Sequence, residues 1–330
     1  MNSIDFINYK GTQYSIGGVN GKTHLKILIL GNSYATDAWS YVPFILKNYG
    51  ITCEIVIYFR GALSLDELYN RWDETKQWDE ESTTESYGAR RYLYTIDTRT
   101  QTSWQGVKPT LERKSAHQLC LEDGWDIITL LQWSAYTVDY TTFEPYMTDV
   151  IDLIREAKAE AGNEESWHLG FQMSWTRAVA DYPTNNLASH LSNDKAQPID
   201  ILFPCSTAVF NARQNANLAA IGSYDGQLDG PGPAHNLWQD GVHLEEGLPC
   251  YIAALAIVQS LFDKYWRGLT VLGDTTIPTR TNVVTNWNVP QRQLPSGSSE
   301  LPHVLDEDYR YLAQKAAILA NKYKFEINGV

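Results

Sequence analysis

The chain has 330 residues, of which 43% are hydrophobic and 12% aromatic, so it is long enough to bury one large core. It carries 26 lysines and arginines against 39 aspartates and glutamates, a formal net charge of -13. A surface of this sign argues against nucleic acid or an anionic membrane as the main partner.

The sequence shows no segment that would insert into a membrane. No apolar run reaches the length of a transmembrane helix. The first residues lack the basic stretch and apolar core of a signal peptide, and the compartment is left open.

The four cysteines favour buried free thiols. They lie far apart, form no Cys-x-x-Cys pair and disfavour a zinc site. No histidines have metal-ligand spacing such as HExxH, so we expect no metal site. The cysteines are Cys53, Cys120, Cys205 and Cys250.

Residues 1–23 predict an N-terminal arm in the form of a small hairpin. Apolar and polar residues alternate on both sides of Lys10-Gly11, as in two short paired strands. Such an arm could pack on the body, mediate self-association or attach the protein to a larger assembly. The sequence leaves these alternatives open.

Five short apolar runs predict strands that are buried on both faces of a parallel sheet. Helical patterns separate these runs, which indicates a sheet covered by helices on both sides. The expected fold class is therefore α/β, a three-layer α/β/α arrangement around a five-stranded, mostly parallel sheet. The runs are 25–30, 51–59, 125–132, 167–174 and 199–203.

We expect one main domain over residues 24–268. Within it, the long polar and aromatic segment 73–118 predicts a lid-like insertion. Residues 269–330 predict a C-terminal extension that ends in a docking helix at about 306–324. The apolar face expected for this helix is formed by Tyr311, Leu312, Ala316 and Leu319.

Ser33 follows the first strand directly, in the turn Gly31-Asn32-Ser33, and a helical pattern begins within a few residues. A serine on such a turn lies at the carboxyl edge of the sheet, where open α/β sheets bind ligands. Gly61 follows the second strand and could present a bare backbone N–H to a ligand. Both residues could equally be ordinary turn residues.

Asp240 and His243 are three residues apart on a loop that enters a long helix. Ester hydrolysis needs a nucleophile, a base and a group that orients the base. The Asp240 carboxylate could hold one imidazole nitrogen while the other faces Ser33. The alternative is that Asp240 caps the coming helix and His243 is a surface histidine.

Four features in order resemble the SGNH (GDSL-like) hydrolase family over residues 24–266. They are the Gly-Asn-Ser turn, a glycine after the second strand, an amide after the third, and Asp-x-x-His before a long helix. GNSYATDAW, WDIITLLQ and DGVHL resemble a carbohydrate-associated branch with glutamine at the third block. The commoner members have Gly-x-Asn-Asp there, whereas this chain has Leu131-Gln132-Trp133.

The resemblance implies a flavodoxin-like SGNH hydrolase fold and a serine hydrolase site without a cofactor. It assigns Ser33 as nucleophile, His243 as base and Asp240 as the partner of the base. The backbone N–H groups of Ser33 and Gly61 and the Gln132 side chain would form the oxyanion hole.

The functional hypothesis is a serine esterase that removes acyl groups from a small substrate. The expected acyl group is acetyl, and the expected substrate is a glycan. The alternatives are a lipid or thioester hydrolase and a non-catalytic carbohydrate-binding or structural module. The resemblance also suggests an extracytoplasmic location or a surface or virion assembly. Candidate substrate-binding residues are Asn32, Trp133, Trp175, His235 and Trp238, although large aromatics are more often core residues.

Overall fold

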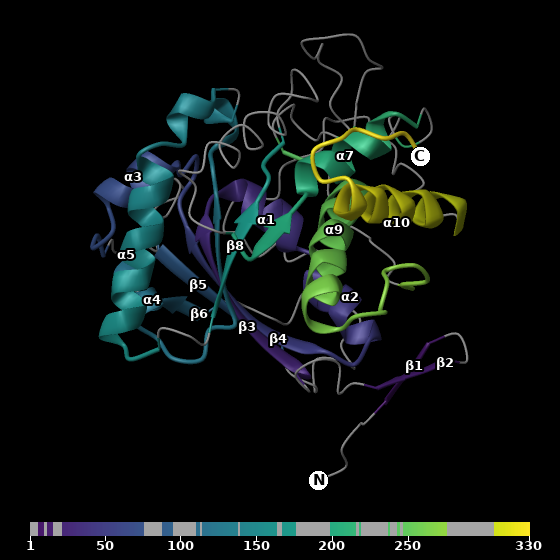
Figure 1. Ribbon diagram of the computed structural model, residues 1–330, viewed down its shortest axis with the longest axis horizontal. Coiled ribbons are helices and arrows are strands. Elements are labelled where there is room, and N and C mark those ends of the chain that lie inside the picture. Colours follow the sequence, from purple (N-terminus) through teal and green to yellow (C-terminus); the bar gives the residue numbers. More distant parts are fainter. Residues whose placement is uncertain are drawn as a thin grey trace, which may run out of the picture.

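A computed structural model describes most of the chain. The described residues are 6–9, 12–15, 22–75, 88–94, 110–112, 114–137, 139–163, 167–175, 199–215, 243–244, 247–275 and 307–330, together with Leu218 and Leu237. They form a seven-stranded sheet with helices on both faces and a separate two-stranded hairpin (Figure 1).

The hairpin pairs β1 (Phe6–Tyr9) with β2 (Thr12–Ser15) in antiparallel register. It lies within the predicted N-terminal arm. Its proposed role in self-association or attachment stays a prediction.

Five neighbouring strands of the large sheet are parallel, in the order β4-β3-β7-β8-β9. This confirms the five predicted strands. The order is that of a flavodoxin-like sheet, with its topological switch point between β3 and β7. The strands are β3 (His24–Gly31), β4 (Thr52–Phe59), β7 (Ile127–Leu131), β8 (His168–Gln172) and β9 (Ile201–Phe203).

Two further strands extend the sheet beyond β4. β5 (Gly88–Tyr94) pairs antiparallel with β4, and β6 (Thr110–Glu112) pairs antiparallel with β5. Both strands belong to the segment 73–118, for which a lid-like insertion was expected. These two strands widen the sheet. Most of the remaining segment lies outside the described residues, so the lid-like insertion stays a prediction.

The helices divide between two faces, each with its own apolar core. Figure 1 shows the two layers on opposite sides of the sheet, which confirms the predicted α/β/α arrangement. One face carries α3 (Leu65–Asn70), α4 (Ala116–Cys120) and α5 (Tyr146–Glu160). The other carries α1 (Ser33–Trp39), α2 (Val42–Asn48), α7 (Cys205–Arg213), α9 (Leu248–Tyr265) and α10 (Glu307–Lys322). Short 3-10 turns at Ser134–Tyr136 and Tyr140–Thr142 follow β7.

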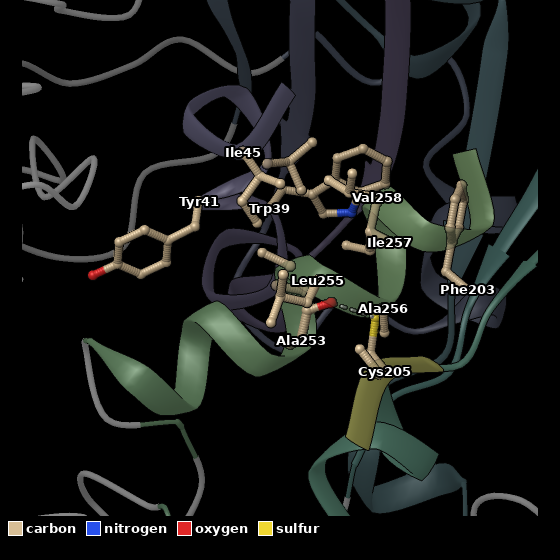
Figure 2. Packing of buried hydrophobic residues seen from close by; sticks show 14 of the residues in the cluster. Trp39, Tyr41, Ile45, Phe203, Cys205, Ala253, Leu255, Ala256, Ile257 and Val258 are labelled. Atoms are coloured by element: carbon tan, nitrogen blue, oxygen red, sulfur yellow. Dashed lines mark hydrogen bonds between the residues drawn. The ribbon is translucent and has the colours of Figure 1, made fainter. Parts of the chain in front are cut away.

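α9 is buried around most of its circumference, as its almost uninterrupted apolar sequence requires. Figure 2 shows Ala253, Leu255 and Val258 within this core. The Cys205 thiol lies 3.7 Å from the Ala253 carbonyl oxygen. All four cysteines are free and buried, as predicted. Burial raises the pKa of the Cys53, Cys120 and Cys205 thiols, which makes them poor nucleophiles.

α10 docks against α7 and α9 through small residues. Its buried stripe consists of Ala313, Ala316, Ala317 and Ala320. Of the apolar face expected for this helix, Ala316 is buried, but Tyr311 is 56% exposed and lies on the solvent side. The Asn211 amide donates to the Ala316 carbonyl at 3.3 Å. Among the described residues, no helix is both long and apolar enough to span a bilayer.

Candidate active site

The end of β3 approaches the end of β7 closely, and this explains the glycine before the nucleophile turn. A Cβ atom at Gly31 would overlap the Leu131 side chain. Glycine therefore permits the two strand ends to approach at the topological switch point. Ser33 follows two residues later as the first residue of α1.

Asn32 connects this turn to the loop after β4. Its Oδ1 accepts the N–H of Tyr34 at 3.0 Å and caps α1, while its Nδ2 donates to the Leu63 carbonyl at 2.9 Å. The side chain has no exposed surface. These contacts give Asn32 a structural role in the turn, and its contact with substrate stays a prediction.

Ser33 and His243, which are 210 positions apart in the chain, meet at this edge of the sheet. The distance from Ser33 Oγ to His243 Nε2 is 2.8 Å, within the range for a hydrogen bond between a nucleophile and its base. The Tyr34 ring lies 6.0 Å from the imidazole, centroid to centroid, and is tilted by 37° to it.

Three of the predicted site residues have no described placement. Asp240, the expected partner of His243, lies outside the described residues, as do His235 and Trp238. Their roles stay predictions.

The loop after β4 runs beside the nucleophile turn. Arg60 donates its backbone N–H to the Gly31 carbonyl at 3.2 Å, so Gly61 lies next to the turn that carries Ser33. Leu63 N–H donates to the Arg60 carbonyl at 3.3 Å and closes a turn with Ala62 at φ 56°. A positive φ is costly for alanine, roughly 1–2 kcal/mol, and such strain is often held at functional sites.

Gln132 joins three segments around the site. Its Oε1 accepts backbone N–H groups from Leu65 at 3.1 Å and from Trp133 at 2.9 Å. Its Nε2 donates to the Thr142 carbonyl at 3.0 Å, and the side chain has no exposed surface. The contacts give Gln132 a bracing role, and its assignment to the oxyanion hole stays a prediction.

The two described tryptophan candidates differ in exposure. Trp133 is half-buried and packs edge-to-face on Tyr136 with ring centroids 5.0 Å apart; Tyr136 is 37% exposed. Trp175 has no exposed surface and packs behind the site against Tyr34 at 4.7 Å. The stacking of Trp175 on a sugar ring stays a prediction, and its burial favours a core role.

Sequence reasoning missed two residues that hold α1 in place. Gln172, at the end of β8, accepts from Trp39 Nε1 at 2.9 Å and donates to the Tyr34 carbonyl at 3.2 Å. The Asp37 carboxylate accepts the N–H of Leu244 at 3.1 Å. The available signal for Asp37 was its position one helical turn after Ser33, which places both side chains on one face of α1.

Neither a protein-family model nor a curated protein matches the chain. Among solved structures, the crystal structure of a DUF4886 family protein from Bacteroides uniformis ATCC 8492 is similar, with a TM-score of 0.63 and 18% sequence identity. The similarity covers 93% of this chain and 98% of that one. It shows the fold alone.

A second solved structure, of a proposed SGNH hydrolase from Slackia heliotrinireducens, has a TM-score of 0.35 and 19% identity. That match covers 72% of this chain and 99% of the other. A TM-score this low supports no inference about this chain.

Proposed function

We propose that this protein is a serine hydrolase of the SGNH type that cleaves carboxylic esters. The observation that carries the proposal is the 2.8 Å distance between Ser33 Oγ and His243 Nε2 at the topological switch point of the sheet. The order of motifs along the chain supports it independently.

In the proposed reaction, Ser33 Oγ attacks the ester carbonyl while His243 Nε2 takes the hydroxyl proton. The protonated imidazole then gives this proton to the departing alcohol, which leaves an acyl-serine. Water, deprotonated by His243, attacks the acyl carbon, and the proton returns to Ser33 as the acid is released.

The developing oxyanion needs hydrogen-bond donors that are already in place. The backbone N–H of Ser33 suits this role, because the first N–H groups of a helix have no partner within it. Gly61 N–H is the second proposed donor, since its loop is hydrogen-bonded to the end of β3. Gln132 remains the proposed third donor through the second N–H of its amide.

We propose an acetylated glycan as the substrate. The Trp133–Tyr136 pair supports this choice, because an exposed aromatic ring beside a strand end offers a face for a sugar ring. The resemblance to a carbohydrate-associated branch points the same way.

Turnover of p-nitrophenyl acetate, butyrate and octanoate by the wild type and by Ser33→Ala and His243→Ala tests the proposal. Loss of the nucleophile or base should lower kcat roughly ten-thousand-fold or more. Ser40→Ala is the matched control, since Ser40 Oγ bonds the Asp37 carbonyl and not the site histidine. It should keep its activity.

Chain-length preference and an acetylated polysaccharide then separate the substrates. Preference for acetate together with acetate release from the polysaccharide supports a glycan substrate, whereas preference for octanoate favours a lipid. Equal inactivity of the wild type and both variants on every ester would contradict catalysis. Glycan binding without turnover would then favour a carbohydrate-binding module.

A further inference from the structure

The helix that carries the proposed nucleophile also contacts the segment that carries the proposed base. Ser33 and Asp37 are four residues apart on α1 and therefore lie on the same side of it. The Asp37 Oδ2 atom accepts the backbone N–H of Leu244 at 3.1 Å, and Leu244 directly follows His243 in the chain.

Within the part of the chain that the structure describes, two further contacts anchor Leu244. Its side chain is 1% exposed and belongs to the core beneath α9. Its carbonyl oxygen lies 3.9 Å from the Cys250 thiol, which is on α9 itself. The Cys250 contact links the segment to α9, and the apolar core around the Leu244 side chain contains residues of both α1 and α9. The Asp37 hydrogen bond ties the backbone of this segment to α1.

We propose that Asp37 is a positioning residue: its carboxylate holds the His243–Leu244 backbone against α1 and so sets the distance between Ser33 Oγ and His243 Nε2. A carboxylate that accepts a backbone N–H forms a stronger bond than a neutral acceptor does. The inference rests on the proposed function, because only a Ser33–His243 reaction gives this distance a catalytic meaning.

The expected consequence is a change in the rate of the chemical step. If the segment loosens, the imidazole samples positions from which it cannot take the Ser33 proton, while the turn that carries Ser33 stays in place. A displacement of about 1 Å at a reacting group can lower a rate roughly a hundredfold. A residue needed only for folding would instead lower the fraction of active protein and the thermal midpoint.

The test compares the wild type with Asp37→Ala, Asp37→Asn and a control, Asp152→Ala. Asparagine keeps an oxygen that can accept the Leu244 N–H, and alanine does not. Asp152 is a half-exposed carboxylate on α5, on the other face of the sheet. For each protein, kcat and KM for p-nitrophenyl acetate, the thermal midpoint and the hydrogen exchange of the Leu244 amide are measured.

We expect Asp37→Ala to lower kcat roughly a hundredfold with KM unchanged, and to speed exchange of the Leu244 amide at least about tenfold. Asp37→Asn should have a kcat and a Leu244 exchange rate close to those of the wild type. Asp152→Ala should change neither kcat nor Leu244 exchange. Unchanged kcat or unchanged Leu244 exchange in a folded Asp37→Ala protein would overturn the inference.

Failure of the proposed function gives a different pattern. If the wild type turns over no more ester than Ser33→Ala does, the hydrolase proposal fails. Leu244 exchange still decides whether Asp37 holds the segment: faster exchange in Asp37→Ala supports the structural link, and unchanged exchange overturns it.

Discussion

Gln132 satisfies three backbone groups that belong to three different segments. Two are N–H donors, of Leu65 and Trp133, and one is the Thr142 carbonyl. A single buried amide therefore fixes the start of α3 and the turns after β7 relative to the end of the strand. At the scale of the residue, buried polar side chains such as this one hold the site together between the two apolar cores.

Gln132→Ala should lower the free energy of unfolding by about 2–4 kcal/mol, because it leaves backbone donors and an acceptor without partners at a buried position. Urea denaturation measures the loss. Gln118→Ala is the matched control: Gln118 is exposed and its Oε1 accepts one backbone N–H, from Ser115. This substitution should lower the free energy of unfolding by about 1 kcal/mol. Equal losses in the two variants would contradict the bracing role.

At the scale of the element, β3 and α1 organise the site together. β3 brings its last residue, Gly31, against the Leu131 side chain of β7, and α1 begins two residues later with Ser33 as its first residue. Asn32, Gln172 and Asp37 then fasten α1 to the loop after β4, to β8 and to the His243 segment. The short helix depends on these contacts, since seven residues are too few for an independently stable helix.

Gly31→Ala should separate the ends of β3 and β7, because the added methyl group overlaps the Leu131 side chain. Overpacking of this kind costs about 1–3 kcal/mol of stability, and displacement of Ser33 should lower kcat as well. Urea denaturation and ester turnover measure the two effects. Gly329→Ala, where the new methyl group would make an ordinary contact, should be neutral.

A double-mutant cycle with Leu131→Ala isolates the overlap in Gly31→Ala. The smaller side chain makes room for the methyl group, so the double variant should lose less stability than the sum of the single variants. Strict additivity would show that the cost of Gly31→Ala arises elsewhere.

The parallel strands could be predicted because each is an apolar run, as burial on both faces requires. Ser33, Gly61 and His243 could be placed at one edge because the carboxyl ends of such strands lie together. β5 and β6 could not be foreseen, since antiparallel pairing with β4 leaves little trace in a polar segment. Leu244, the partner of Asp37, lies 207 positions away, and Leu65, one of the partners of Gln132, lies 67 positions away, so only the folded chain reveals these two contacts.

At the scale of the whole molecule, the two helical layers bury several ionisable groups without using them in the site. Tyr251 lies in the core beneath α10 and donates to the Asp274 carboxylate at 2.7 Å. Burial, followed by the negative charge of Asp274, raises the pKa of Tyr251 well above its usual value. Burial also raises the pKa of Tyr265.

These tyrosines should make the fold sensitive to alkali. In the unfolded chain a tyrosine ionises near pH 10, whereas the native residues keep their protons at higher pH. The unfolded state then binds fewer protons than the native state, so stability is fully present below about pH 10 and falls as the pH rises further.

Urea denaturation between pH 8 and pH 11 tests this expectation, using the wild type and Tyr251→Phe. Removing the phenol hydroxyl should reduce the slope with which the free energy of unfolding falls above pH 10 by up to about 1.4 kcal/mol per pH unit. The variant also lacks the hydrogen bond to Asp274, but the stability lost with this bond should be the same at all pH values below 10. Parallel curves for the two proteins would contradict the role of Tyr251.

Covalent labelling with a fluorophosphonate ester tests the central proposal most directly, because the reagent phosphonylates serines that an adjacent base activates. Mass spectrometry of the digested wild type should find the phosphonyl group on Ser33, and His243→Ala should slow its attachment by orders of magnitude. Ser33→Ala should remain unlabelled. An unmodified Ser33 in the wild type, or equal labelling of Ser33→Ala at another residue, would contradict the assignment of Ser33 as the nucleophile.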